Sequence, residues 1–310
     1  MNKKRYYDFK TYLRSTFNTV VHKIPIDAGF TCPNRDGRIS YNGCIYCNAK
    51  GSGTGAFAQG ISIKEQIIQG QRFLKKRYKA HKFLAYFQSF SNTYAPVDIL
   101  KKKYDEALAP NDMVGLCIGT RPDCIDDDKL DLISNYKRDY LVWIEYGLQS
   151  FNDATLNRIN RGHVVNDFLT ALDKTRSRNI NVCAHIILGL PGETKKDMMK
   201  MAQYLGKLDI QGVKIHLLYV IKGTALETLY NEGHYHCLSQ NHYIDIVSEF
   251  IAWLPSHIII HRVTSDPHAH ELIAPSWCTR KAEFLKKFQD HLGKKDLWQG
   301  KFTSHQSPRF

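Results

Sequence analysis

Three cysteines lie close together near the N-terminus, in the segment FTCPNRDGRISYNGCIYCNA at residues 30–49. Eleven residues separate Cys32 from Cys44, and two separate Cys44 from Cys47. A structural zinc ion would need a fourth Cys or His ligand at a suitable spacing, and no second CxxC pair is present. Three thiolates can instead hold an iron–sulfur cluster and leave one iron open to another molecule. The spacing therefore favours such a cluster over zinc or over unrelated reduced thiols.

The composition is typical of a globular protein with a large core. The chain has 310 residues, of which 43% are hydrophobic, and no apolar run is long enough to span a bilayer. The N-terminal residues MNKKRYYDFK are not followed by the apolar stretch of a secretory signal. We therefore predict a cytoplasmic protein without a membrane segment, whose eight cysteines are reduced thiols rather than disulfides.

Positive charge is concentrated in a few runs of the sequence. The formal net charge is +13 and the pI is about 9.3. Each run alone is most simply a solvated helix face, but together they favour a polyanionic partner such as nucleic acid. The runs are residues 3–5, 74–82, 101–103 and 279–287.

Short β-rich segments alternate with longer amphipathic segments after the cysteine loop, which is the pattern of repeated βα units around a parallel sheet. We predict a partial (β/α)6 TIM-like barrel at residues 19–225, preceded by a basic segment at 1–18 and followed by a small C-terminal extension at 226–310. The predicted strands are Val20–Asp27, Phe83–Phe87, Met113–Ile118, Leu141–Tyr146, Val182–Leu188 and Val213–Leu218; the predicted helices are 62–78, 97–107, 126–136, 165–178 and 195–208, with 243–254 and 279–292 in the extension.

Polar residues follow the ends of the predicted strands. In α/β barrels the chemistry lies on the loops at the C-terminal ends of the strands, so these residues are expected to share one edge of the barrel with the cysteines. They are Gln88, Ser89, Ser91 and Asn92; Thr120, Arg121 and Asp123; Gln149 and Ser150; residues 189–193; and Lys222 and Thr224.

The CxxC pair with Tyr46 before its last cysteine, placed after the first of six βα units, resembles the cluster loop of the radical S-adenosylmethionine (radical SAM) enzymes. The usual spacing there is CxxxCxxC, and the longer first gap is similar to a narrower branch, the YhcC/YtqA-like group, which is related to the radical SAM domain of the Elongator catalytic subunit. Further matching segments are QSFSNTYAP at 88–96, GTRPDCI at 119–125, EYGLQS at 145–150, NRINRGH at 157–163 and HIILGLPGET at 185–194, with a weaker match at 272–281.

The resemblance implies one [4Fe–4S] cluster on Cys32, Cys44 and Cys47, with S-adenosylmethionine (SAM) bound to the open iron. Reductive cleavage of SAM to a 5′-deoxyadenosyl radical would follow, with an electron donor such as flavodoxin or ferredoxin. No residue of this chain is assigned a catalytic role. Cys124, Cys237 and Cys278 show no second cluster motif.

The same resemblance suggests contacts to SAM. Tyr46 would pack near the adenine, and Arg161 would pair with the methionine carboxylate, unless it is a surface or RNA-facing residue. Glu145 would accept from the ribose hydroxyls, unless it is a solvent-facing strand residue. The other expected contacts are Gln88, Ser89 and Asn92 near the methionine amino group or the substrate, Gln149 and Ser150 on the same edge, and Gly189 and Gly192 in a turn along the adenine, for which an ordinary glycine turn is the alternative.

The resemblance to Elongator and the positive net charge together suggest tRNA as the substrate. The candidate step is conversion of carboxymethylaminomethyluridine to aminomethyluridine at the C5 position of a wobble uridine. Two alternatives stay open at this point: a radical SAM reaction on a small metabolite, and a non-catalytic zinc protein that binds nucleic acid.

Overall fold

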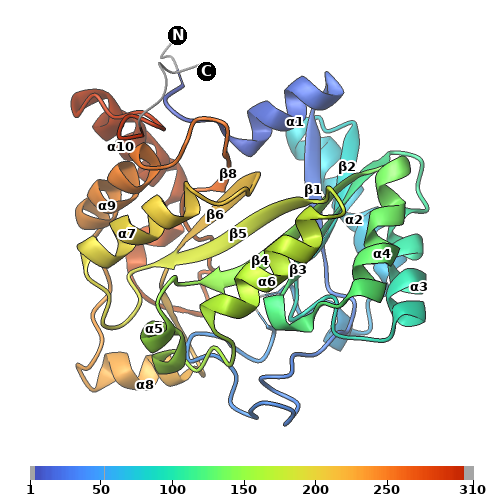
Figure 1. Cartoon of the computed structure of the whole chain (residues 1–310), viewed down its shortest axis with the longest axis horizontal. Coiled ribbons are helices and arrows are strands. Elements are labelled where there is room, and N and C mark those ends of the chain that lie inside the picture. Colours follow the sequence, from blue (N-terminus) through green and yellow to red (C-terminus); the bar gives the residue numbers. More distant parts are fainter. Residues whose placement is uncertain (1–3, 52, 304–310) are drawn as a thin grey trace.

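Seven parallel strands form one curved sheet in the order β1-β2-β3-β4-β5-β6-β8 (Figure 1). The computed structural model describes residues 4–51 and 53–303, so the ends of the predicted N-terminal segment and C-terminal extension lie outside the described residues. The strands are β1 (Val21–Ile26), β2 (Lys82–Phe87), β3 (Met113–Thr120), β4 (Leu141–Gln149), β5 (Asn181–Leu188), β6 (Gly212–Leu217) and β8 (Ile259–Arg262).

The predicted half-barrel is confirmed, with one more strand than the sequence indicated. The β-rich run near residue 260, which the sequence pattern places in the extension, is β8 and pairs with β6 through Gly212 and Ile259. A two-stranded antiparallel sheet of β7 (Val220–Ile221) and β9 (Leu272–Ala274) lies beside the barrel.

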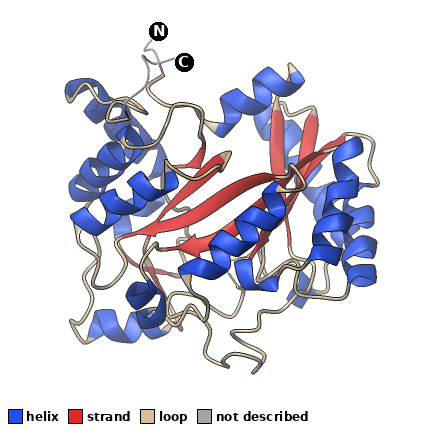
Figure 2. Cartoon of the chain, viewed as in Figure 1, coloured by secondary structure: helices blue, strands red, loops and turns tan. Residues whose placement is uncertain are grey.

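Helices cover the convex face of the sheet (Figure 2). Local capping sets their starts: the side chain of Ser62 accepts from the backbone of Glu65, and the Glu65 carboxylate accepts in return from the backbone of Ser62. The helices are α1 (Phe9–Phe17), α2 (Ile63–Tyr78), α3 (Val97–Leu108), α4 (Asp127–Asn135), α5 (Asp153–Arg158), α6 (Val165–Arg176), α7 (Lys195–Leu205), α8 (Ala225–Asn231), α9 (Gln240–Ala252) and α10 (Lys281–Lys294). No helix among the described residues is long and apolar enough to cross a membrane.

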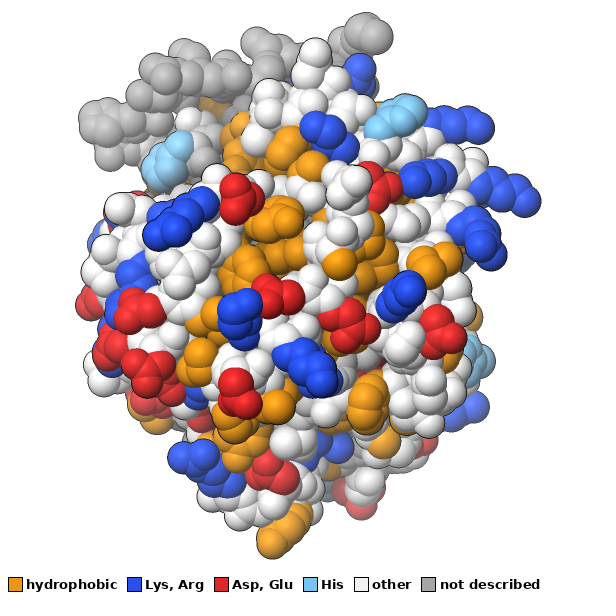
Figure 3. All heavy atoms as spheres, turned by 90° about the vertical axis from the view of Figure 1, so that its right-hand side faces the viewer, with side chains coloured by type: hydrophobic (Ala, Val, Ile, Leu, Met, Phe, Trp, Pro, Cys, Tyr) orange, Lys and Arg blue, Asp and Glu red, His pale blue; other side chains and the backbone are white. Residues whose placement is uncertain are grey.

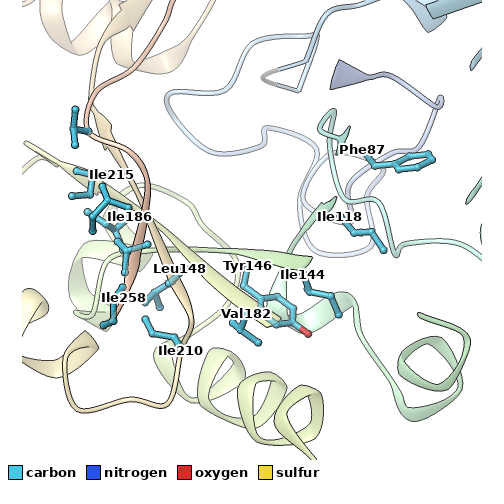
Figure 4. Packing of buried hydrophobic residues seen from close by; sticks show 14 of the residues in the cluster. Phe87, Ile118, Ile144, Tyr146, Leu148, Val182, Ile186, Ile210, Ile215 and Ile258 are labelled. Atoms are coloured by element: carbon cyan, nitrogen blue, oxygen red, sulfur yellow. The ribbon is translucent and has the colours of Figure 1, made fainter. Parts of the chain in front are cut away.

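Side chains point alternately to the two faces of the sheet along each strand, and they form a separate hydrophobic cluster on each face. Side chains such as Ile144 and Tyr146 point outward and pack under the helices, as Figure 4 shows for this larger cluster. A smaller cluster, including Trp143, fills the inside of the curve at the N-terminal edge of the strands. Helix α1, which the sequence pattern does not predict, closes that edge, because its Phe9 packs edge-to-face on Trp143 at 5.8 Å.

Candidate active site

The cysteine loop follows β1 and lies below the sheet in the view of Figure 1. Two turns shape it: the backbone N–H of Arg35 donates to the carbonyl of Cys32 at 2.8 Å, and that of Cys47 donates to Cys44 at 2.9 Å. The loop is tied to the barrel because the N–H of Ile45 donates to the carbonyl of Ile159 at 3.1 Å. All three cysteine residues line one cavity of about 400 Å³ at the C-terminal edge of the strands.

Two donors point at the sulfur of Cys44. Asn34 Nδ2 lies 3.7 Å from the sulfur, and Arg161 Nη1 lies 3.6 Å from it. Arg161 is buried and also donates to the carbonyl of Gly147 at 2.7 Å, so its guanidinium is held in place. Donors of this kind stabilise a thiolate and tune a cluster bound through it, so the donor set fits an iron–sulfur centre. Within the described residues, no three Cys, His, Asp or Glu side chains are grouped closely enough to hold a single metal ion.

Five of the residues expected to contact SAM line this cavity together with the cysteines. The hydroxyl of Tyr46 is buried there without a hydrogen-bond partner among the described residues. Gln149 has a backbone φ of 72°, at a bulge where β4 meets β5. Such a conformation is costly for a non-glycine residue and is often found at functional sites. The five are Tyr46, Gln88, Glu145, Gln149 and Arg161.

The other five expected residues do not line the cavity, and their contact with SAM stays a prediction. Ser89 is buried against Gly53, and its hydroxyl has no partner among the described residues. Asn92 donates to the carbonyl of Gly119 at 2.7 Å. The hydroxyl of Ser150 donates to Glu193.

The glycine turn after β5 holds the last two of these residues. Gly189 and Gly192 both have positive φ, 88° and 82°, which favours glycine. A Cβ at Gly192 would overlap the guanidinium of Arg158, which donates to the carbonyl of Pro191 at 3.1 Å. The ordinary requirements of a turn therefore account for both glycines.

Glu145 is fully buried, so the alternative of a solvent-facing strand residue is wrong. Its carboxylate accepts from His185 Nε2 at 2.7 Å and from Lys214 Nζ at 3.1 Å, and it forms an ion pair with Lys23. His261 Nδ1 lies 3.7 Å away on the same side. We call this inward-facing layer of β1, β4, β5, β6 and β8 the cavity floor, because Glu145, His185 and Lys214 line the cavity.

Burial and charge set the protonation of the floor. Burial alone would raise the pKa of Glu145, but the charges of Lys214 and Lys23 hold it well below its usual 4.5. Burial lowers the pKa of Lys214 to about 8 despite the attraction of Glu145. Burial and Lys214 lower the pKa of His185 to about 4, so this ring is neutral near pH 7.

Sequence reasoning gave no role to several floor residues. Lys23, His185 and Lys214 are ionisable residues within strands that are otherwise mostly apolar, and that contrast was the available signal. His216 and Arg262 also line the cavity and were missed.

The basic run at 74–82 does not lie beside the cavity. It spans the end of α2 and the start of β2, which is the N-terminal edge of the parallel sheet, whereas the cysteines follow the C-terminal end of β1. Figure 3, viewed from the side of α3 and α4, shows Lys and Arg side chains gathered toward the upper right, with acidic side chains interspersed lower down. The run is therefore not part of this site.

A parallel half-barrel whose C-terminal edge carries three thiols in one cavity defines an α/β-barrel enzyme that holds an iron–sulfur cluster. Comparison with known sequences is more specific. Residues 34–205 match the profile described as the Radical SAM superfamily, and residues 210–294 match the Radical_SAM C-terminal domain. The chain belongs to the radical SAM superfamily, and its cofactors are a [4Fe–4S] cluster and SAM.

Two relatives match over most of their length. The chain is 39% identical to the uncharacterized protein YtqA of Bacillus subtilis, over 96% of this chain and 93% of the relative. It is 36% identical to protein YhcC of Escherichia coli K12, over 87% of this chain and 86% of the relative. These matches confirm the branch that the cysteine spacing resembled.

The fold and part of the sequence are also similar to Elongator-type proteins. The structure of archaeal Methanocaldococcus infernus Elp3 superposes with a TM-score of 0.69 at 18% identity, covering 90% of this chain and 64% of that chain. A tRNA uridine(34) acetyltransferase of Dehalococcoides mccartyi is 27% identical over 49% of this chain and 33% of the relative. The shared part is thus a minor portion of the acetyltransferase.

Proposed function

We propose that this protein is a radical SAM enzyme that modifies the C5 side chain of the wobble uridine in tRNA. The candidate step converts carboxymethylaminomethyluridine and water to aminomethyluridine and glyoxylate, and SAM is the two-electron oxidant that leaves as methionine and 5′-deoxyadenosine. The observation that carries the proposal is a single cavity that joins the three cluster cysteines to a cationic floor, in a chain related to a tRNA uridine(34) acetyltransferase. The bound cofactors supply a carbon radical that can abstract hydrogen from the substrate.

The chain's own residues position these groups. Cys32, Cys44 and Cys47 would hold the cluster, while Arg161 and Asn34 orient the sulfur of Cys44. Tyr46 and Gln149 would lie against SAM. We place the enzyme in the cytoplasm, with a flavodoxin or ferredoxin as the electron donor.

An RNA substrate would present one unstacked base of the anticodon loop to the cavity, as single-stranded RNA is usually recognised. Exposed groups on the cysteine loop suit this contact: Tyr41 is 79% exposed, and Arg38, three residues earlier in the sequence, is also exposed. Lys222 is exposed directly after Ile221, which lines the cavity.

The cellular test measures modified nucleosides. Bulk tRNA from cells without this protein should accumulate carboxymethylaminomethyluridine and lack aminomethyluridine, and the wild-type gene should restore the product. A Cys44→Ala gene should not restore it. An unchanged nucleoside profile in the deletion strain would remove tRNA from the proposal and leave a small metabolite as the substrate.

Charge reversal of Arg38 and Lys222 together should weaken tRNA binding by about one to two orders of magnitude at low salt, because phosphate contacts are lost. Each lost phosphate contact should also flatten the salt dependence of binding. Filter binding across a salt series measures both effects. Lys76→Glu, in the exposed run at the opposite edge, is the matched control and should have a smaller effect. Equal losses in both variants would mean that RNA does not approach the cavity edge.

A further inference from the structure

The cavity floor carries more positive than negative charge. Lys23 and Lys214 both pair with a single floor carboxylate, Glu145, and Arg262 lies beside Lys214 as a third cation. The floor histidines add no charge near neutral pH, because burial and neighbouring lysines lower the pKa of His185 to about 4 and of His261 to about 3. Three cations against one carboxylate leave a surplus of positive charge inside the barrel.

The other acidic residues lining the cavity do not cancel this surplus. Asp266 pairs with Lys281 at 2.6 Å, and Glu271 pairs with Lys50. The cavity's remaining arginines are also committed elsewhere. For example, Arg121 forms an ion pair with Asp123 at 2.7 Å.

Arg262 stands apart from these pairs. It lines the cavity next to Lys214, its register partner on β6, and its guanidinium makes no hydrogen bond or ion pair with another described residue. Nearby, His216 Nε2 is buried without a hydrogen-bond partner among the described residues. Buried polar groups normally find partners, and a guanidinium binds carboxylates through two parallel hydrogen bonds. Both groups therefore have unused capacity for an anion.

We propose that Arg262, Lys214 and His216 bind a carboxylate of the substrate at the cavity floor. This deepens the proposed function and rests on it: the carboxymethyl group of the candidate substrate has such a carboxylate, and the product lacks it. The floor would thus select the substrate over its own product. A phosphodiester backbone is less suitable, because Lys214 lines the cavity from inside the barrel and is only 6% exposed.

The experiment compares two synthetic anticodon stem-loops that differ only in having carboxymethylaminomethyluridine or aminomethyluridine at the wobble position. Reconstituted wild-type enzyme should bind the carboxylate form roughly 10- to 100-fold more tightly, as expected for charge-assisted hydrogen bonds. Arg262→Gln should lose this preference, and Arg262→Lys should keep part of it. Arg138→Gln, an exposed arginine at the far edge before β4, is the matched control and should keep the wild-type preference.

A second probe, N-methylglycine, has the same aminoacetate end without RNA. Calorimetric titration should detect its binding to wild-type enzyme, competition by inorganic phosphate should be weak, and Arg262→Gln should not bind it. If wild-type enzyme binds neither stem-loop but binds N-methylglycine through Arg262, the tRNA assignment fails and the carboxylate site stands. If the stem-loop preference persists in Arg262→Gln, the site fails and the tRNA assignment stands. Loss of SAM affinity in Arg262→Gln would assign the arginine to the methionine carboxylate and overturn the proposal.

Discussion

Cys44→Ala is expected to abolish SAM cleavage, reducing 5′-deoxyadenosine formation to background. Cys44 is buried, and it is the one cluster cysteine whose sulfur receives donors from two other side chains, Asn34 and Arg161. With two thiolates left, a [4Fe–4S] cluster loses one of the three protein ligands that would hold it. Anaerobic reconstitution with iron and sulfide, followed by reduction with dithionite and quantification of 5′-deoxyadenosine, measures the effect.

Cys237→Ala is the matched control, because Cys237 is a free cysteine that does not line the cavity. It should bind iron and cleave SAM as wild type does. Metal analysis separates the alternatives: about four irons per chain in wild type and in the control is the expected result. Stoichiometric zinc in wild-type protein, with no SAM cleavage, would contradict the cluster assignment and revive the zinc-protein hypothesis.

Most of the barrel could be predicted because its strands carry a local signal. The run at 141–149, for example, is buried along nearly its whole length and is followed by a polar loop, so its position needed no tertiary information. The seventh strand was missed as a barrel strand because β8 has only four residues and a long connection, residues 218–258 with β7, α8 and α9, separates it from β6. Its place is set by pairing with β6, which is a contact between distant segments.

Helix α1 was missed for a different reason. Its signals are local but sparse: Asp8 caps the helix, and only Phe9 and Leu13 are buried along its nine residues. Its role in closing the barrel depends on Trp143, far away in the sequence.

The candidate site also has one part with a local sequence signal and one part that depends on contacts between distant residues. The cysteine loop could be found because three reactive side chains lie within sixteen residues, Cys32 to Cys47, and their spacing carries the meaning. The floor could not, because its polar side chains come one or two at a time from five strands and the charges compensate only in three dimensions. Lys23 and Glu145 are 122 residues apart, and Glu145 and Lys214 are 69 apart. A lone buried charge in a strand predicts that a compensating partner exists, but it does not indicate which residue that partner is.

Glu145→Gln should destabilise the protein by about 3–5 kcal/mol near neutral pH, the usual cost of removing one partner from a buried ion pair. The change leaves Lys23 and Lys214 without their shared carboxylate inside the barrel. Urea unfolding of the anaerobically purified protein measures the loss. Glu283→Gln, which breaks the surface pairs of Glu283 with Arg280 and Lys287, is the control and should cost less than about 1 kcal/mol.

The pH dependence provides a further check on the same residue. The folded-state pKa of Glu145 lies below its usual 4.5, so its contribution to stability is present above that pH and is lost as the pH falls toward the folded-state pKa. The stability gap between wild type and Glu145→Gln should therefore be largest near neutral pH and shrink on acidification.

Removing a cation together with the carboxylate tests the charge argument directly. Lys214→Met in the Glu145→Gln background takes away one of the two stranded ammonium groups, so the double variant should recover part of the lost stability. Strictly additive losses, or a gap between wild type and Glu145→Gln that does not change with pH, would mean that Glu145 acts through packing. In that case the floor would lack the surplus positive charge that an incoming carboxylate needs.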